Sequence, residues 1–134
     1  MKLVLDSNVL IAAFASEGLC HSLLEYCLEN ASVFLTETLC QEVRKGLEKK
    51  VRLPSFLIDE IISLLKEQME YVPPSPSLFS PGECRDPKDL FLLNLAAAQK
   101  CEYLVTGDHD LLVLHEVRSV KIVSPREFWN RIKR

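Results

Sequence analysis

Short apolar runs and amphipathic stretches alternate along the chain. Lys2–Leu5 and Ser32–Leu35 are mostly apolar runs without alternating polar residues, a pattern typical of strands that are covered on both faces of a parallel sheet. Residues 71–72, 103–106 and 120–123 are three further strand candidates. The pattern therefore predicts five short strands spread over the whole sequence.

The segments between these strands carry apolar residues three or four positions apart, which is the spacing of one face of a helix. Capping residues mark three helix starts: Thr36 or Thr38, Asp86 and Ser124, the last two followed by proline. Because helices follow strands in turn, we expect one α/β domain over residues 1–134 with a mostly parallel sheet. The predicted helices span residues 8–14, 21–29, 39–47, 55–69, 87–98, 111–115 and 125–132.

The composition fits one globular domain in the cytosol. The chain has 134 residues, of which 48% are hydrophobic and 26% charged, which suffices for a single core. No apolar run is long enough to cross a membrane. The cysteines are odd in number and irregularly spaced, with no Cys-x-x-Cys pair, which argues against a disulfide framework or a zinc site. We therefore expect a cytoplasmic protein with reduced thiols.

Two acidic residues follow predicted strands. Asp6 comes directly after the first strand, and Asp108 comes two residues after the strand at 103–106. In open α/β sheets ligands bind beyond the carboxyl ends of the strands, so both acids are expected at the edge where a site forms. Asp110 lies two residues beyond Asp108 and could join it, and Asn8 could support Asp6 through a hydrogen bond.

Two further acids can reach the same edge from helices. Glu42 lies at the rim of an apolar helix face, and Asp89 lies in the first turn of another helix, where the dipole favours a carboxylate. Clustered carboxylates repel one another unless cations bridge them, and Mg²⁺ and Mn²⁺ prefer such oxygen ligands. Paired ions of this kind catalyse phosphodiester cleavage. The acids therefore predict nuclease chemistry despite a net charge of −3, because bound cations invert the local charge.

Each acid alone also has a purely structural interpretation. Asp6 and Asp108 could cap the helices that follow them, and capping is the favoured role of Asp86. Glu42 alone would usually be a solvated helix residue. The hypothesis of a site depends on the set, because two acids follow strands on one edge and the other two can converge there.

Basic residues near these acids could bind a substrate. The group between Arg44 and Arg52 could contact phosphates, or it could form a solvated helix face. Arg85 and Lys88, beside Asp89, are better placed to bind a substrate phosphate.

Four pieces of the sequence stand in order along nearly the whole chain: Leu3-Val4-Leu5-Asp6-Ser7-Asn8-Val9-Leu10, Glu42, Cys84-Arg85-Asp86-Pro87-Lys88-Asp89, and Val105-Thr106-Gly107-Asp108-His109-Asp110-Leu111-Leu112. In this combination they resemble the PIN-domain family. The last two pieces look most like its prokaryotic branch, which is related to the VapC-type toxins of toxin–antitoxin systems. The combination is specific, whereas each piece alone is not.

The resemblance implies a three-layer α/β/α sandwich with a five-stranded parallel sheet. It implies an endoribonuclease that depends on Mg²⁺ or Mn²⁺, with one or two ions bound. Thr106 would orient the last acid or a metal-bound water, and Asn8 would hold Asp6. Family members often dimerise and are often blocked by an antitoxin, so the implied partners are RNA, a cognate antitoxin and a second copy. The implied metal ligands are Asp6, Glu42, Asp89, Asp108 and Asp110, of which the first four are also the implied catalytic residues.

Two other interpretations remain open. The PIN-domain family contains degenerate members, so the chain could be a catalytically inactive module that binds RNA or protein; the presence of all four acids argues against this. A phosphotransfer hydrolase with Asp6 as its nucleophile would need a second aspartate two residues on, where this chain has Asn8.

Overall fold

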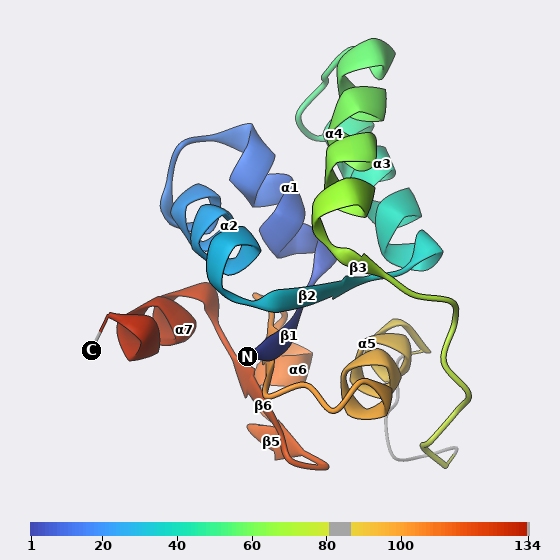
Figure 1. The fold of residues 1–134 in the computed structure, drawn as a ribbon, viewed down its shortest axis with the longest axis vertical. Coiled ribbons are helices and arrows are strands. Elements are labelled where there is room, and N and C mark those ends of the chain that lie inside the picture. The colour runs from blue at the N-terminus through green and yellow to red at the C-terminus, as the bar shows by residue number, and fades with distance from the viewer. Residues whose placement is uncertain (81–86, 134) are drawn as a thin grey trace.

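A six-stranded sheet runs through the middle of the described chain, with strands in the order β3-β2-β1-β4-β6-β5 (Figure 1). The computed structural model describes residues 1–80 and 87–133, apart from the side chain of Lys88. All neighbouring strands are parallel except β5 and β6. The strands are β1 (Lys2–Leu5), β2 (Ser32–Leu35), β3 (Glu70–Tyr71), β4 (Tyr103–Val105), β5 (Glu116–Val117) and β6 (Val120–Val123).

The predicted five-stranded parallel sheet is confirmed, and β5 adds one antiparallel strand at its edge. The sequence pattern does not predict β5 because the turn that joins it to β6 has an unusual composition. Arg118 and Ser119 both have positive φ angles, of 48° and 70°, which a two-residue hairpin turn requires. Such turns normally carry Gly or Asn, and their absence here hides the hairpin.

Helices cover both faces of the sheet, which gives the predicted three layers. Figure 1 shows α5 on one side of the sheet and α1, α2 and α7 on the other. Contacts join α5 to β1 and β4, and α7 to β6. The helices are α1 (Ser7–Ala15), α2 (Leu19–Asn30), α3 (Glu37–Lys49), α4 (Ser55–Gln68), α5 (Pro87–Ala98), α6 (His109–Leu112) and α7 (Pro125–Ile132).

The core is built around the central strand. Leu3, Val4 and Leu5 of β1 are at most 1% exposed, because helices cover this strand on both faces. This burial explains why the strand has no polar alternation. At the other end of the chain, Phe128 of α7 is fully buried and contacts the Tyr103 ring edge-on, with 5.3 Å between ring centroids. The last helix is thereby fixed to the sheet.

Capping residues begin two helices as the sequence predicts. The Thr36 hydroxyl accepts a hydrogen bond from the Leu39 N–H at 3.3 Å, so Thr36 rather than Thr38 is the cap of α3. The Ser124 hydroxyl accepts from the Glu127 N–H at 3.1 Å, with Pro125 in the first turn of α7. The predicted cap at residue 86 lies outside the described residues.

The helices α1 and α3 approach closely at a glycine. A side-chain carbon added to Gly46 would lie 2.2 Å from Cδ1 of Ile11 and 2.8 Å from its Cγ1. Glycine therefore allows Ile11 of α1 to pack directly on the backbone of α3. This contact fixes the position of α3 relative to the helix that follows β1.

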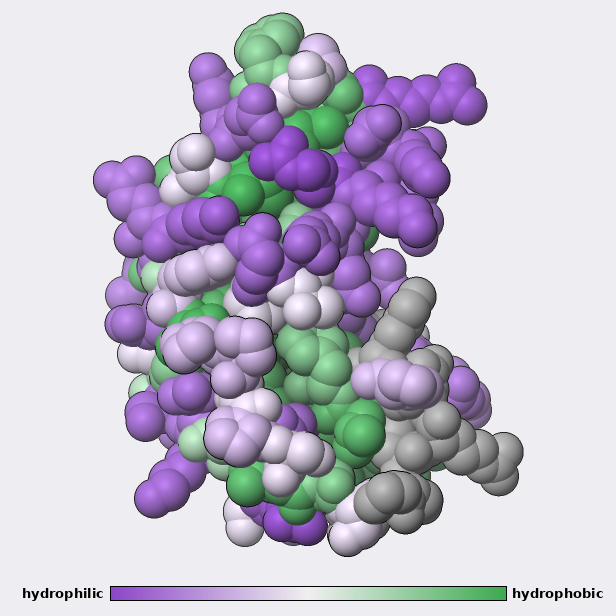
Figure 2. All heavy atoms as spheres, turned by 90° about the vertical axis from the view of Figure 1, so that its right-hand side faces the viewer, coloured by the Kyte–Doolittle hydropathy of each residue, from purple (hydrophilic) through white to green (hydrophobic). Residues whose placement is uncertain are grey.

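The surface of the α3–α4 pair is mostly polar. Figure 2 shows hydrophilic side chains over much of the upper half of one side of the molecule, where Figure 1 places α3 and α4. In α3 the buried positions Leu39, Val43 and Leu47 repeat every four residues, so the charged residues of this helix lie on its other faces. No single helix in the described chain is long and apolar enough to cross a membrane; α1 and α2 reach that length only together, bent by 111°.

Candidate functional site

The site begins at the carboxyl ends of the neighbouring strands β1 and β4. Leu5 pairs with Val105 in the sheet, so the residues that follow them, Asp6 and Thr106, also lie side by side. The Thr106 hydroxyl donates a hydrogen bond to Asp6 Oδ2 at 2.7 Å and accepts one from the Asp108 N–H at 3.0 Å. One fully buried hydroxyl thus links the segments that carry two of the predicted acids.

Asp6 is held at both carboxylate oxygens. Its Oδ1 accepts a hydrogen bond from the Ser7 N–H at 2.7 Å, and the Ser7 hydroxyl lies 3.4 Å from the same oxygen. The side chain caps α1 and is only 6% exposed. The capping role and a role in a site are therefore compatible, because the capped carboxylate still lines an open cavity.

Replacing Thr106 by valine should destabilise the protein. Valine keeps the shape but removes the hydroxyl, which leaves the buried Asp6 Oδ2 and the Asp108 N–H without this partner. We expect a loss of about 1–3 kcal/mol in the free energy of unfolding, measured by urea denaturation. Thr106→Ser keeps the hydroxyl and should retain most of the stability; equal stability of the valine variant and the wild type would contradict this role.

Asp108 begins the short helix α6. Its Oδ1 accepts a hydrogen bond from the Asp110 N–H at 3.0 Å, so this acid is a helix cap, as its structural interpretation proposed. The helix consequently begins at His109, two residues earlier than the apolar pattern indicates. The carboxylate is half-buried and also lines the cavity that contains Asp6.

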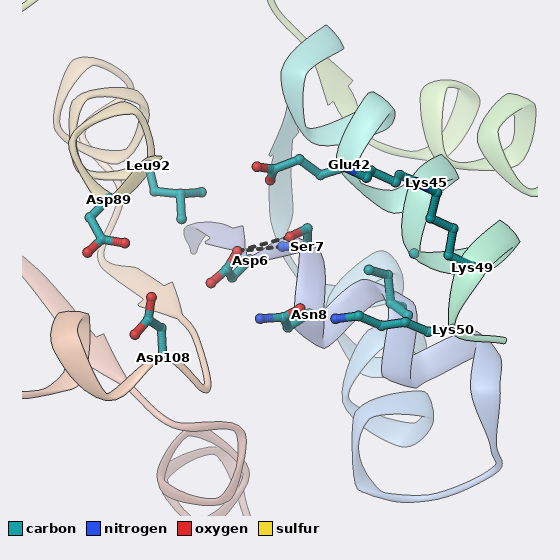
Figure 3. Close-up of a pocket in the computed structure, with 12 residues that line it drawn as sticks. Asp6, Ser7, Asn8, Glu42, Lys45, Lys49, Lys50, Asp89, Leu92 and Asp108 are labelled. Atoms are coloured by element: carbon teal, nitrogen blue, oxygen red, sulfur yellow. Dashed lines mark hydrogen bonds between the residues drawn. The ribbon is translucent and has the colours of Figure 1, made fainter. Parts of the chain in front are cut away.

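The other two acids reach the same cavity from helices. Asp89, in the first turn of α5, is 5% exposed, and Glu42 of α3 is half-buried. Figure 3 shows Asp6, Asp89 and Asp108 turned toward a common space, with Glu42 pointing toward it from above. The cavity has a volume of about 600 Å³. Its lining residues are Asp6, Ser7, Asn8, Ile11, Glu42, Lys45, Gly46, Lys49, Lys50, Asp89, Leu92 and Asp108.

The structure places Asn8, a supporting candidate, and Asp110, an implied metal ligand, differently from the sequence-based expectation. Asn8 was expected to hold Asp6, but the hydrogen bonds to Asp6 come from Ser7 and Thr106. The reason is that Asn8 already belongs to the first turn of α1, from which its exposed side chain points into the cavity. Asp110 is exposed and is not among the lining residues; its backbone N–H serves the cap of α6.

The basic residues of the cavity also differ from those expected. Lys45, Lys49 and Lys50 of the α3 segment line it, although the sequence left open whether they face a ligand or solvent. Arg85 and the side chain of Lys88, which were expected to bind a substrate phosphate, lie outside the described part of the chain.

The donor set suits a hard divalent cation in its chemistry. Carboxylate oxygens are the ligands that Mg²⁺ and Mn²⁺ prefer, and two of these acids are more than nine-tenths buried. The described residues contain no group of three or more His, Cys, Asp or Glu already arranged to hold an ion. Ion binding would therefore require the other cavity carboxylates to move closer to Asp6. This approach raises the repulsion among them, and only a bound cation would offset it.

Fold and site together define an α/β protein with an acidic cavity at the carboxyl edge of a parallel sheet. The chain belongs to the PIN domain family, whose model matches residues 2–110. Its fold is similar to that in the crystal structure of VapBC2 from Rickettsia felis bound to a DNA fragment from their promoter. That match has a TM-score of 0.64 and 16% sequence identity, and covers 92% of this chain and 98% of the other. No curated protein sequence matches the chain.

Proposed function

We propose that this chain is a single-domain endoribonuclease that hydrolyses RNA phosphodiesters with the help of bound Mg²⁺ or Mn²⁺. One observation carries the proposal. Asp6, Glu42, Asp89 and Asp108 come from four separate segments, and all four line one cavity. Like charges repel one another, so four acids around one cavity indicate a shared role. Membership of the PIN domain family favours a nuclease site as that role.

The four acids would hold one or two ions, with Asp6 as the central ligand. Bound ions supply an activated water and stabilise the leaving oxygen of the phosphodiester. Hydrogen bonds from Ser7 and Thr106 hold both carboxylate oxygens of Asp6 in place. Asp89 and Asp108 both lie on the side of Asp6 that faces away from α3, with Asp89 above Asp108 in Figure 3. If two ions bind, Glu42 and Asp89 would complete the site of one ion, and Asp108 would bind the other.

We further propose that the protein is the toxin of a toxin–antitoxin pair and acts in the cytoplasm. The structural likeness to VapBC2 supports this assignment, together with the motif around Thr106 and Asp108 that resembles VapC-type toxins. A cognate antitoxin would then be a partner, and a homodimer would be the functional form.

A catalytically inactive module that binds RNA or protein is the alternative. It is favoured by one observation: in the described residues, no three His, Cys, Asp or Glu side chains lie close enough together to hold a metal ion. Such a module would bind RNA equally well with and without metal and would leave it intact.

RNA cleavage should require a divalent cation. We expect purified protein to shorten a labelled single-stranded RNA in MgCl₂ or MnCl₂, to stop in excess EDTA, and to resume when Mn²⁺ is added beyond the chelator. Denaturing gels and mass spectrometry of the products would record the cleavage and the expected 5′-phosphate and 3′-hydroxyl ends. Cleavage that continues in EDTA would exclude the metal mechanism, and metal-independent binding without cleavage would favour the inactive module.

A further inference from the structure

Three lysines form the wall of the cavity that faces Asp89 and Asp108. Lys45, Lys49 and Lys50 all line the cavity, and Figure 3 shows them on the α3 side, across from these two acids. The cavity is therefore divided by charge: carboxylates gather at the sheet edge, and ammonium groups extend along the helix.

Helix geometry explains this division. Residues three, four and seven positions apart share one face of a helix, so Glu42, Lys45, Gly46 and Lys49 form a single stripe along α3. Lys49 lies about 10 Å further along the helix axis than Glu42. Gly46 has no side chain, and Ile11 packs on the backbone at this position of the stripe. The stripe thus leads from the acids outward along one side of the cavity.

The fold does not use these lysines as ion-pair partners. All three are exposed, and none forms an ion pair with a carboxylate in the described residues. Their neighbour Arg44, by contrast, points to another face of α3 and pairs with Asp59 of α4 at 2.7 Å. Like charges four residues apart, as at Lys45 and Lys49, destabilise a helix slightly. Three such cations at one cavity indicate an anionic ligand.

We propose that Lys45, Lys49 and Lys50 bind the phosphates of single-stranded RNA next to the bond that is cut. The inference rests on the proposed function and names the path that its substrate takes. A phosphodiester chain carries repeated negative charges, which match cations that are spread along a helix better than a single small anion does. A cavity of about 600 Å³ is within the usual size of ligand sites and is large enough for part of a flexible single strand.

The lysines are positioning residues in this proposal. The carboxylates repel the RNA backbone, so a strand needs cations beside them in order to approach. Contacts to phosphates fix the register of a nucleic acid without reading its sequence. The lysines would accordingly set affinity and salt dependence, while the acids across the cavity act on the scissile phosphate.

Binding measurements with a triple variant test the proposal. The probe is a fluorescent single-stranded RNA, and Asp6→Asn is the background, so that the RNA stays intact in Mn²⁺. We expect K45Q/K49Q/K50Q to weaken binding on the order of tenfold or more, for RNAs of unrelated sequence alike. The slope of log K against log salt should fall by about 2, since each lost phosphate contact on a single strand removes roughly 0.7.

A second triple variant, which removes the same number of positive charges elsewhere, distinguishes a specific binding site from an effect of total charge. K100Q/K121Q/K133Q removes the same charge at exposed positions that do not line the cavity. It should bind RNA within about twofold of the background protein, because phosphate contacts weaken steeply beyond direct reach of the cation. Equal losses in both triples, or no loss in the cavity triple, would overturn the proposal.

Cleavage kinetics of the triple variant in the otherwise wild-type protein distinguish a failure of this inference from a failure of the proposed function. With Asp6 intact, the cavity triple should raise KM for RNA and change kcat little, because the acids are untouched. Metal-dependent cleavage with an unchanged KM would refute RNA binding by the three lysines but would still support the proposed nuclease function. If the wild-type protein never cuts RNA but the cavity triple binds RNA more weakly, RNA binding by the lysines is supported and the proposed nuclease function is refuted. Thermal unfolding of both triples verifies that they fold.

Discussion

Asp6→Asn should lower the rate of RNA cleavage on the order of a thousandfold or more while the protein stays folded. The substitution replaces the carboxylate of the acidic cavity by a neutral amide, so the proposed divalent cation would lose its central ligand. Asparagine still accepts the hydrogen bond from the Ser7 N–H, because Asn and Asp are comparable helix caps. One negative charge fewer among four also relieves repulsion in the absence of metal.

Cleavage rates at saturating Mn²⁺, together with melting temperatures, check this prediction. Asp59→Asn is the matched control, since Asp59 lies on α4, is exposed and pairs only with Arg44 among the described residues. It should cut RNA at the wild-type rate. If Asp6→Asn remains fully active, the cavity acids are not the catalytic centre; if it unfolds, Asp89→Asn provides the same test at an acid that does not cap α1.

The five parallel strands and most helices can be predicted from the local sequence, whereas the β5–β6 hairpin cannot. A buried strand such as Lys2–Leu5 can be recognised in the sequence because both of its faces need apolar side chains. Caps such as Ser124 are equally local, because the hydroxyl and the N–H that it satisfies lie three residues apart. The β5–β6 hairpin depends on positive φ angles at Arg118 and Ser119, which neither residue type favours. Tertiary packing, rather than local preference, determines that turn.

The positions of the strand acids in the site were predictable, whereas the hydrogen-bond partners of Asp6 were not. Asp6 and Asp108 follow strands, and topology alone puts both at one edge of the sheet. The link through Thr106 depends on β1 and β4 being neighbours in the sheet, and sequence order does not reveal strand order. Spacing along the chain favours Asn8 as the partner of Asp6, but Ser7 and Thr106 are the residues that bind it.

The basic group of α3 shows why a charge run cannot be interpreted from sequence alone. Arg44 and Lys45 are adjacent, yet successive helix residues point about 100° apart. One of them forms an ion pair with Asp59 and the other lines the cavity. Only the packing of α3 against α1 and α4 decides which face is which, and the close contact at Gly46 sets that packing. The sequence pattern therefore left both interpretations open.

Metal binding should stabilise the folded protein, and this effect should depend on Glu42. At a hundred times its dissociation constant, Mn²⁺ bound only to the folded state raises the free energy of unfolding by about 2.7 kcal/mol. Glu42→Gln removes one anionic donor from the cavity and should weaken Mn²⁺ binding roughly tenfold or more, because loss of a ligand costs at least as much as loss of its supporting partner. Thermal unfolding over a series of MnCl₂ concentrations measures both quantities.

Glu48→Gln is the matched control for this measurement. Glu48 is on the same helix and carries the same charge, but it is exposed and does not line the cavity. Its variant should respond to Mn²⁺ as the wild type does. Because the proposed ligands all line one cavity of the folded protein, the response to Mn²⁺ should come mainly from that cavity rather than from general surface charge. Equal responses of the two variants, or none in the wild type at millimolar Mn²⁺, would show that the acids share a cavity without forming a metal site.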